Sequence, residues 1–192
     1  MRLAEEKDTN LIVDMISDTF KDNKSILYLT GEKKGHLKRI KYLAEYSLKK
    51  GFLFGDVFLS DDRKACAVLI DPKKEIISFK SILLDIKLVF QVLQIVRVPK
   101  AWKREKIIKS FHPKDKSHIH FWFLSTSRKN QGKGIGTKLI KEIKEYYNGR
   151  VIYFETSTKR NLNLYDRLGS NKIAIVDLKE YKLHIYNSDR NV

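Results

Sequence analysis

Cysteine, proline and uninterrupted apolar runs are all scarce in this sequence. Among 192 residues there are one cysteine and three prolines. One cysteine cannot form an internal disulfide, and Cys66 lies within an apolar run, so we expect a buried thiol rather than a reactive nucleophile. No cysteine–histidine cluster suggests zinc, and we expect no metal. A reducing, cytoplasmic setting is consistent with this pattern, and the first eight residues carry no apolar segment typical of a secretion signal.

The longest apolar stretch, residues 82–98, is shorter than the roughly 20 residues that a membrane span requires. Polar side chains interrupt it, among them Asp85, Lys87 and Arg97, and Pro99 is expected to end it. We interpret this stretch as a largely buried helix pair or as a lid over a substrate pocket. We therefore expect no membrane partner.

Acidic residues are outnumbered, since 39 Lys and Arg face 23 Asp and Glu and give a formal net charge of +16. More than half of the excess lies in residues 101–150, with 13 basic and 4 acidic residues. We interpret the basic residues of 103–116 as a solvated helix face; an anionic acceptor site and a nucleic-acid surface stay open as alternatives. No nucleic-acid motif is present, so nucleic acid is not the partner we expect.

The most informative segment runs from Gln131 to Thr137 and contains three alternating glycines. Residues 119–124 predict a buried strand before it, and the apolar stripe of residues 135–147 predicts a helix after it. Glycines at such a junction leave the first amides of the helix open, and the helix dipole favours an anion there. The segment therefore predicts a phosphate site made by Gln131, Gly132, Lys133, Gly134, Ile135, Gly136 and Thr137.

Two common phosphate motifs do not fit this segment. The dinucleotide fingerprint needs a glycine where Thr137 stands, and a Walker A loop needs Ser or Thr where Gly134 stands. The pattern that remains, Gln131 with Gly134 and Gly136, resembles the acyl-coenzyme A pyrophosphate loop of the GNAT superfamily of N-acetyltransferases. A glycine-rich turn that merely starts a helix is the structural alternative.

The downstream sequence strengthens this resemblance. GNAT enzymes carry a strand and then a short helix with a Tyr-x-x-x-Gly signature, which a strand pattern at 151–157 and the pair Tyr165 and Gly169 match. The resemblance covers residues 118–186. It implies a mixed α/β fold, with a central mixed sheet flanked by helices and with splayed strands that bind the donor.

We expect one GNAT domain over residues 1–192. Its parts are N-terminal helices and a hairpin (1–78), a helical insert (79–110), a donor-binding core (118–170) and closing strands (171–192). Helices are expected at 8–20, 35–49 and within 79–110, a hairpin at 52–59 and 65–70, and strands at 151–156, 173–176 and 183–186. Asp8 is predicted to cap the first helix and Gly51 to stop the second.

The resemblance implies acetyl-coenzyme A as co-substrate and direct transfer of its acetyl group to a primary amine in a ternary complex. Leu124, Ser125 and Thr126 are expected to line the pantetheine arm, although Thr126 stands where the family more often has Val. Asn161 resembles the family's side-chain contact to the donor arm, and a helix cap is its alternative role.

Tyr165 matches the residue that in this family protonates the coenzyme A sulfur. A phenol with a pKa near 10 suits a general acid, and a core aromatic is the alternative. Glu155 is the first candidate for the base, although it could pair with a nearby lysine or position the acceptor, and His120 is the second. Ser170 stands where the family usually has Phe, which alters the edge of the pocket.

The acceptor stays open between a small molecule and a peptide amine, and a homodimer is compatible with the family. Two other functions also stay open. One is a catalytically silent sensor with a GNAT fold that binds coenzyme A, and the other is a basic protein associated with nucleic acid.

Overall fold

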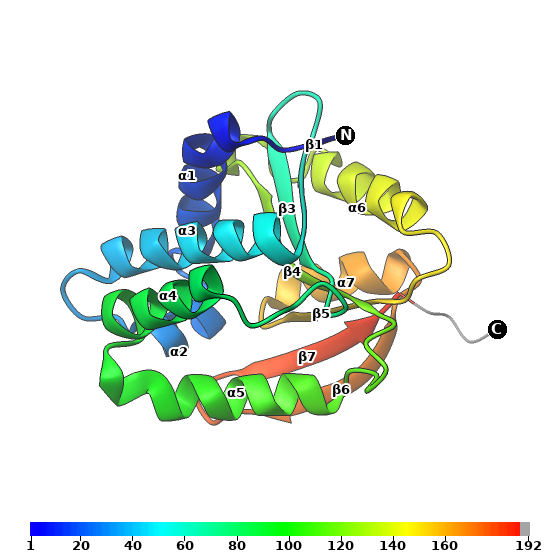
Figure 1. Cartoon of the computed structure of the whole chain (residues 1–192). Coiled ribbons are helices and arrows are strands. Elements are labelled where there is room, and N and C mark those ends of the chain that lie inside the picture. The colour runs from blue at the N-terminus through cyan, green and yellow to red at the C-terminus, as the bar shows by residue number, and fades with distance from the viewer. Residues whose placement is uncertain (189–192) are drawn as a thin grey trace.

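A computed structural model describes residues 1–188, which form a mixed seven-stranded sheet with helices on both faces (Figure 1). The strands are β1 (Arg2–Leu3), β2 (Gly55–Leu59), β3 (Ala65–Ile70), β4 (Ile119–Thr126), β5 (Ile152–Thr156), β6 (Asn171–Asp177) and β7 (Lys182–Asn187). They lie in the order β1-β2-β3-β4-β5-β7-β6, and within the described chain only β4 and β5 run parallel. The expected mixed α/β fold is confirmed; residues 189–192 of the expected closing segment lie outside the described residues.

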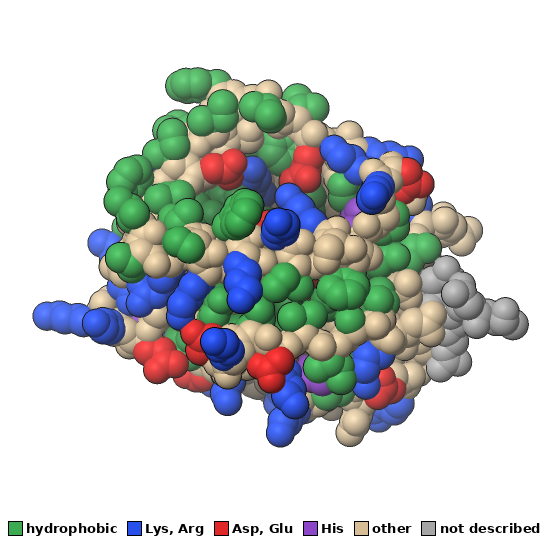
Figure 2. All heavy atoms as spheres, turned by 90° about the horizontal axis from the view of Figure 1, so that it is seen from below, with side chains coloured by type: hydrophobic (Ala, Val, Ile, Leu, Met, Phe, Trp, Pro, Cys, Tyr) green, Lys and Arg blue, Asp and Glu red, His purple; other side chains and the backbone are tan. Residues whose placement is uncertain are grey.

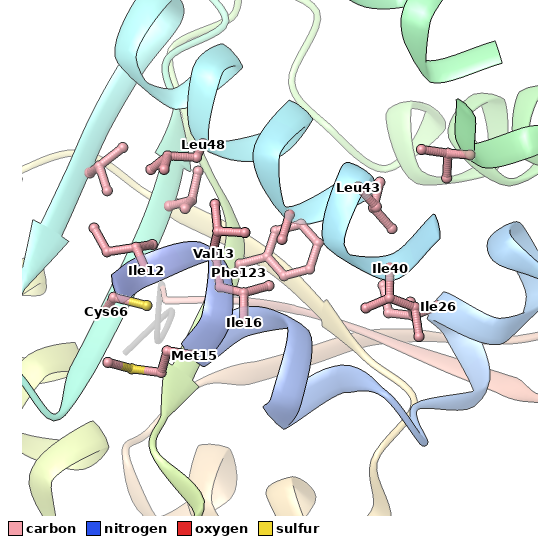
Figure 3. Packing of buried hydrophobic residues seen from close by; sticks show 14 of the residues in the cluster. Ile12, Val13, Met15, Ile16, Ile26, Ile40, Leu43, Leu48, Cys66 and Phe123 are labelled. Atoms are coloured by element: carbon pink, nitrogen blue, oxygen red, sulfur yellow. The ribbon is translucent and has the colours of Figure 1, made fainter. Parts of the chain in front are cut away.

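The helices are α1 (Thr9–Phe20), α2 (Lys24–Thr30), α3 (His36–Phe54), α4 (Phe79–Leu88), α5 (Val98–Ser110), α6 (Ile135–Tyr146) and α7 (Lys159–Arg167). Alternation along β3 supplies two cores, because successive side chains of a strand point to opposite faces. Cys66 and Val68 pack with α1 and α3, whereas Ala67 and Leu69 pack with α6. Figure 3 shows Ile12 and other α1 side chains between α3 and the sheet.

Cys66 belongs to the first of these cores and is completely buried. Burial raises the pKa of its thiol to about 12. The expectation of a buried, unreactive cysteine is thus confirmed by its surroundings.

Two local predictions in the N-terminal half are wrong. Gly51 does not stop α3, which continues to Phe54 and displaces the start of the hairpin to Gly55. A Cβ on Gly51 would come within 2.8 Å of the side chains of Val57 and Val68, so this glycine serves close packing between helix and sheet. The sequence did not predict β1 and α2, two short elements whose patterns are weak.

The side chain of Asp8 does not cap α1. It is buried and accepts two hydrogen bonds from Arg2, at 2.8 and 2.9 Å. These bonds lower the pKa of the Asp8 carboxyl to about 2. The ion pair with β1 therefore outcompetes the predicted cap.

The insert is helical as predicted, but it is not largely buried. A π-helical turn, Val89–Leu93, and a short 3-10 turn, Ile95–Arg97, separate α4 from α5. Pro99 lies in the first turn of α5, where a missing amide costs no hydrogen bond, so it does not end a helix there. Much of the apolar surface of 82–98 faces outward, including that of Ile82, Ile86 and Phe90. We found no helix in the described chain that is long and apolar enough to cross a membrane.

Candidate active site

The parallel strands β4 and β5 separate halfway along their length. Their pairing covers only Ile119–Phe121 and Ile152–Phe154. Beyond that point β4 continues beside β3, while Glu155 and Thr156 of β5 pair with β7. The predicted splay is therefore present, and it leaves the β5-facing edge of Trp122–Thr126 without a neighbouring strand among the described residues.

The glycine loop sits at the end of this splay, where β4 leads into α6. Gly132 and Gly134 have φ of +81° and +80°, a conformation that favours glycine, and a Cβ on either would meet nothing within 4 Å. The first helical hydrogen bond at this end runs from the Lys138 amide to the Gly134 carbonyl. The amides of Ile135, Gly136 and Thr137 therefore have no carbonyl partner within α6. Ile135, Gly136 and Thr137 form the first turn of α6, and the Lys133 ammonium donates to Asn130 at 3.3 Å.

Side chains tie this loop to the sheet and to α7. The amide of Gln131 donates to the Thr126 carbonyl at 3.1 Å and accepts from Arg160 at 2.8 Å. A Cβ on Gly136 would come 2.9 Å from the Thr126 hydroxyl, so this third glycine permits close approach of α6 to β4. Contacts with β4 and α7 therefore hold the loop in place.

A cavity of about 890 Å³ extends from the splay towards the insert. Five of the residues predicted from the sequence line this cavity: His120, Leu124, Glu155, Asn161 and Tyr165. Asn161 lies inside α7, two residues past its first residue, and so does not take the helix-cap role. The residues of the glycine loop lie outside this lining.

Ser125 does not point its side chain into this cavity. It is buried on the α1 side, where its hydroxyl oxygen lies 3.0 Å from the Met15 carbonyl oxygen and 2.7 Å from the Thr19 hydroxyl, within hydrogen-bond distance of both. Any contact of Ser125 with a ligand in the splay must therefore involve its backbone.

Glu155 and His120 lie together, with Glu155 Oε2 3.1 Å from His120 Nε2. The other Glu155 oxygen accepts from Arg104 of α5 at 3.2 Å. Burial alone would raise the pKa of the Glu155 carboxyl, but the charges of His120 and Arg104 outweigh it and hold this pKa well below its usual range. Burial lowers the pKa of His120, and the Glu155 charge overcomes this effect and raises it above the ordinary value.

Arg104 was missed as a site residue, because it sits in the basic run interpreted as a solvated face. It lines the cavity and also donates to the Tyr181 hydroxyl at 3.2 Å. Its neighbours Lys103 and Lys106 are exposed, as predicted. The helical spacing of Arg104 with Ile107, Ile108 and Phe111 was the available signal, since these residues share the inward face of α5.

Two further histidines were not singled out by the sequence. The ring of His112 lies 4.5 Å from that of His118 and 5.1 Å from that of His120, measured between centroids. Burial lowers the pKa of His112 to about 3 and that of His118 to about 4, so both rings are neutral at ordinary pH. No group of three or more His, Cys, Asp or Glu in the described chain is arranged to hold a metal ion.

Tyr165 enters the cavity from α7. Its ring lies 4.5 Å from that of Phe154 and 5.6 Å from that of Tyr186, so it packs in an aromatic cluster as well as facing the cavity. Burial, with a smaller effect from the Glu155 charge, raises the pKa of its phenol further above the ordinary value. The hydroxyl is therefore protonated at neutral pH and has a proton to donate.

Known acetyltransferases resemble this chain in part of its sequence and in its fold. Residues 99–169 match the model of the acetyltransferase (GNAT) family. A Corynebacterium glutamicum structure, described as histone acetyltransferase HPA2 and related acetyltransferase, has a TM-score of 0.74 at 18% identity, with 100% of this chain and 96% of that chain covered. An N-acetyltransferase from Staphylococcus aureus has a TM-score of 0.59 at 15% identity, with 97% and 98% covered.

A third structure, arylalkylamine N-acetyltransferase 2 from Aedes aegypti, has a TM-score of 0.63 at 15% identity, with 97% of this chain and 96% of that chain covered. At these identities the structures establish a shared fold, and the family model adds the sequence match across α5, the glycine loop and α7. The chain therefore has the fold of these acetyltransferase structures, and its segment 99–169 matches the acetyltransferase (GNAT) family.

Proposed function

We propose that this protein is an N-acetyltransferase that transfers the acetyl group of acetyl-coenzyme A to a primary amine by direct attack in a ternary complex. The observation that carries the proposal is that Tyr165 and the His120–Glu155 pair line one cavity that opens from the splay. A proton donor and a proton acceptor on one cavity are what aminolysis of a thioester requires.

The residues of the splay and the loop fit such a donor. Open amides at the start of α6, beside Gly132 and Gly134, suit a pyrophosphate, and Lys133 adds a positive charge. The free edge of β4 from Leu124 to Thr126 can receive an extended amide chain through its backbone, as an added strand would be. Asn161 faces the same cavity from α7. When bound, acetyl-coenzyme A supplies the activated acetyl group as a thioester.

We assign the removal of the amine proton to His120. Its Nε2 lies against Glu155, so with a proton on Nε2 its Nδ1 is left to accept the proton of the amine. Both oxygens of Glu155 already have partners, Arg104 and His120, and its pKa is lowered, so Glu155 is a poor base by itself. Glu155 then acts through His120, by orienting the ring and raising its basicity.

Tyr165 is our candidate for the proton donor to the departing sulfur. A phenol kept protonated by burial serves as an acid in this step. If Tyr165 served packing alone, removal of its hydroxyl would leave turnover unchanged.

The acceptor that we favour is an amine with an apolar body. Tyr46, Trp102 and Trp122 are among the residues that line the cavity between α3, α5 and β4. Aromatic walls of this kind gain more from burying a hydrocarbon body than from a polyamine or a sugar. The cytoplasmic location remains part of this proposal, supported by the unpaired, buried Cys66.

The test combines acetyl-coenzyme A titration with an amine screen read by thiol release. We expect saturable donor binding, and the fastest release with alkyl and aralkyl amines. Tyr165→Phe should lower turnover by about 100-fold while donor binding is retained.

Fully active Tyr165→Phe would remove this residue from the mechanism. Donor binding without thiol release from any amine would instead favour the silent sensor over the enzyme.

A further inference from the structure

The insert exposes a dense group of apolar side chains. On α4 they recur every three or four residues and so share one face of the helix: Phe79, Ile82, Leu83 and Ile86. Phe90 extends this face beyond α4, and the exposed apolar side chains continue along residues 76–96 and at Trp102. We call the exposed apolar side chains of 76–96 and Trp102 the apolar lip. No described element covers it, and an exposed patch of this kind marks an interaction site.

The apolar lip surrounds one end of the cavity. Ile76, Ile77 and Trp102 line the cavity and are also exposed, with 91% of Ile77 accessible to solvent. Leu88 and Leu93 line the cavity from the inner side of the same segment. Whatever covers the apolar lip therefore lies at the mouth of the candidate active site.

Basic side chains accompany the apolar lip. Residues 76–106 contain seven Lys and Arg against two Asp and Glu. Arg104 is turned inward to Glu155 and Lys100 pairs with Glu180, which leaves Lys80, Lys87, Arg97, Lys103 and Lys106. Both acidic residues have basic partners: Asp85 lies 3.0 Å from Lys50, and Glu105 lies 3.2 Å from Lys109. Glu75, just before the lip, is exposed. Figure 2, which looks onto the α5 side, shows apolar side chains gathered along one rim with Lys and Arg beside them.

Charge and composition together select the occupant. A second copy would bring another formal charge of +16 and the same lysines against this face, so self-association is opposed. Nucleic acid would satisfy the lysines but offers no apolar medium for Phe79 or Phe90. The surface of an anionic phospholipid bilayer offers both, because Phe, Trp and aliphatic side chains enter the interface while Lys and Arg meet the phosphates.

We propose that the apolar lip docks this protein peripherally on an anionic phospholipid surface, with the mouth of the cavity against the bilayer. The expected absence of a membrane partner rested on the lack of a span, and a helix lying in the interface needs none. Docking of this kind would give the cavity direct access to amphiphilic amines held in the bilayer. It is a binding property and stands whether or not the proposed transferase reaction occurs.

The test is co-flotation of the full chain with vesicles of neutral phosphatidylcholine or of phosphatidylcholine mixed with phosphatidylglycerol. We expect flotation with the anionic vesicles, little with the neutral ones, and a decline as salt is raised. Changing Lys80 and Lys87 to Gln should weaken anionic binding by roughly fivefold for each lysine.

The decisive variant carries Phe79→Ser, Ile86→Ser and Phe90→Ser together. None of these three residues lines the cavity, so acetyl-coenzyme A binding and thermal stability should be unchanged while vesicle affinity falls at least about tenfold. Ile175→Ser is the matched control, because Ile175 on β6 is 55% exposed, similar to the 48% of Ile86, and lies outside the apolar lip. It should float as the unmodified protein does.

Three results would overturn the proposal. One is no flotation with anionic vesicles, and another is flotation that the triple variant retains. The third is a concentration-dependent dimer that the triple variant abolishes, which would assign the apolar lip to a second copy.

Discussion

The proposed donor half and the proposed acceptor half of this candidate site are constructed in different ways. The donor half, from β4 through the glycine loop to α6, offers mainly backbone: a free strand edge and amides kept open by Gly132 and Gly134. The acceptor half, formed by the insert and the start of β4, offers side chains: the aromatic walls of the cavity and the buried Arg104–Glu155–His120 cluster. A backbone site is set by local conformation, whereas a side-chain site depends on which helix packs against it.

His120→Gln is expected to have the largest effect, because it removes the proposed proton acceptor of the acceptor half. Turnover should fall by about 100-fold or more, with little change in acetyl-coenzyme A binding. His36→Gln, in the first turn of α3 and outside the cavity lining, is the control and should keep full activity.

The pH profile of the unmodified protein sharpens this prediction. Since the pKa of His120 is raised, the ring becomes charged and unable to accept a proton as pH falls, so the acidic limb should lie above the ordinary histidine value of about 6.5. Glu155→Gln removes the charge that raises this pKa and should move the limb to lower pH. If the acidic limb of Glu155→Gln lies at the same pH as that of the unmodified protein, the assigned pairing of His120 with Glu155 is wrong.

Arg104→Met is expected to be next in size and acts on stability. Removing one partner of a buried ionic cluster costs about 3–5 kcal/mol, and unfolding in denaturant should show this loss. Lys103→Met, one residue away but exposed, should change stability by no more than about 0.5 kcal/mol. Equal stability in the two variants would mean that Arg104 is not part of a buried cluster.

The Arg104 charge also lowers the pKa of His120. The acidic limb of activity in Arg104→Met should therefore move to higher pH, opposite to the shift expected in Glu155→Gln.

Gly134→Ala is expected to have the smallest effect and tests the donor half. A left-handed conformation costs an L-residue about 1–2 kcal/mol, so the loop should shift and the KM for acetyl-coenzyme A should rise by about tenfold. Gly149→Ala is a matched control, because Gly149 has φ of +79° and equally open space but lies beyond the end of α6. It should lose similar stability and keep the same KM. If KM rose equally in both variants, the rise could not be assigned to the glycine loop, and the prediction would be wrong.

The same division explains how much the sequence could predict. The strand, glycine loop and helix of the donor half follow from local patterns, and the structure has them where expected. The role of Arg104 and the outward face of 82–98 depend on how the insert packs, which a composition-based interpretation of a basic or apolar run cannot resolve. Gly51 gives the same lesson. Its place in the sequence suggested a helix end, whereas the structure shows that a glycine is needed there for close packing against Val57 and Val68.

The buried position of Cys66 has a practical consequence for the chemistry of the assays. Aromatic disulfide reagents react with thiolates, and a fully enclosed thiol with a pKa of about 12 presents almost none. Colour that develops with the folded protein therefore comes from coenzyme A alone, without a protein background. Once the chain unfolds, its one cysteine becomes reactive, so the same reagent counts unfolded molecules.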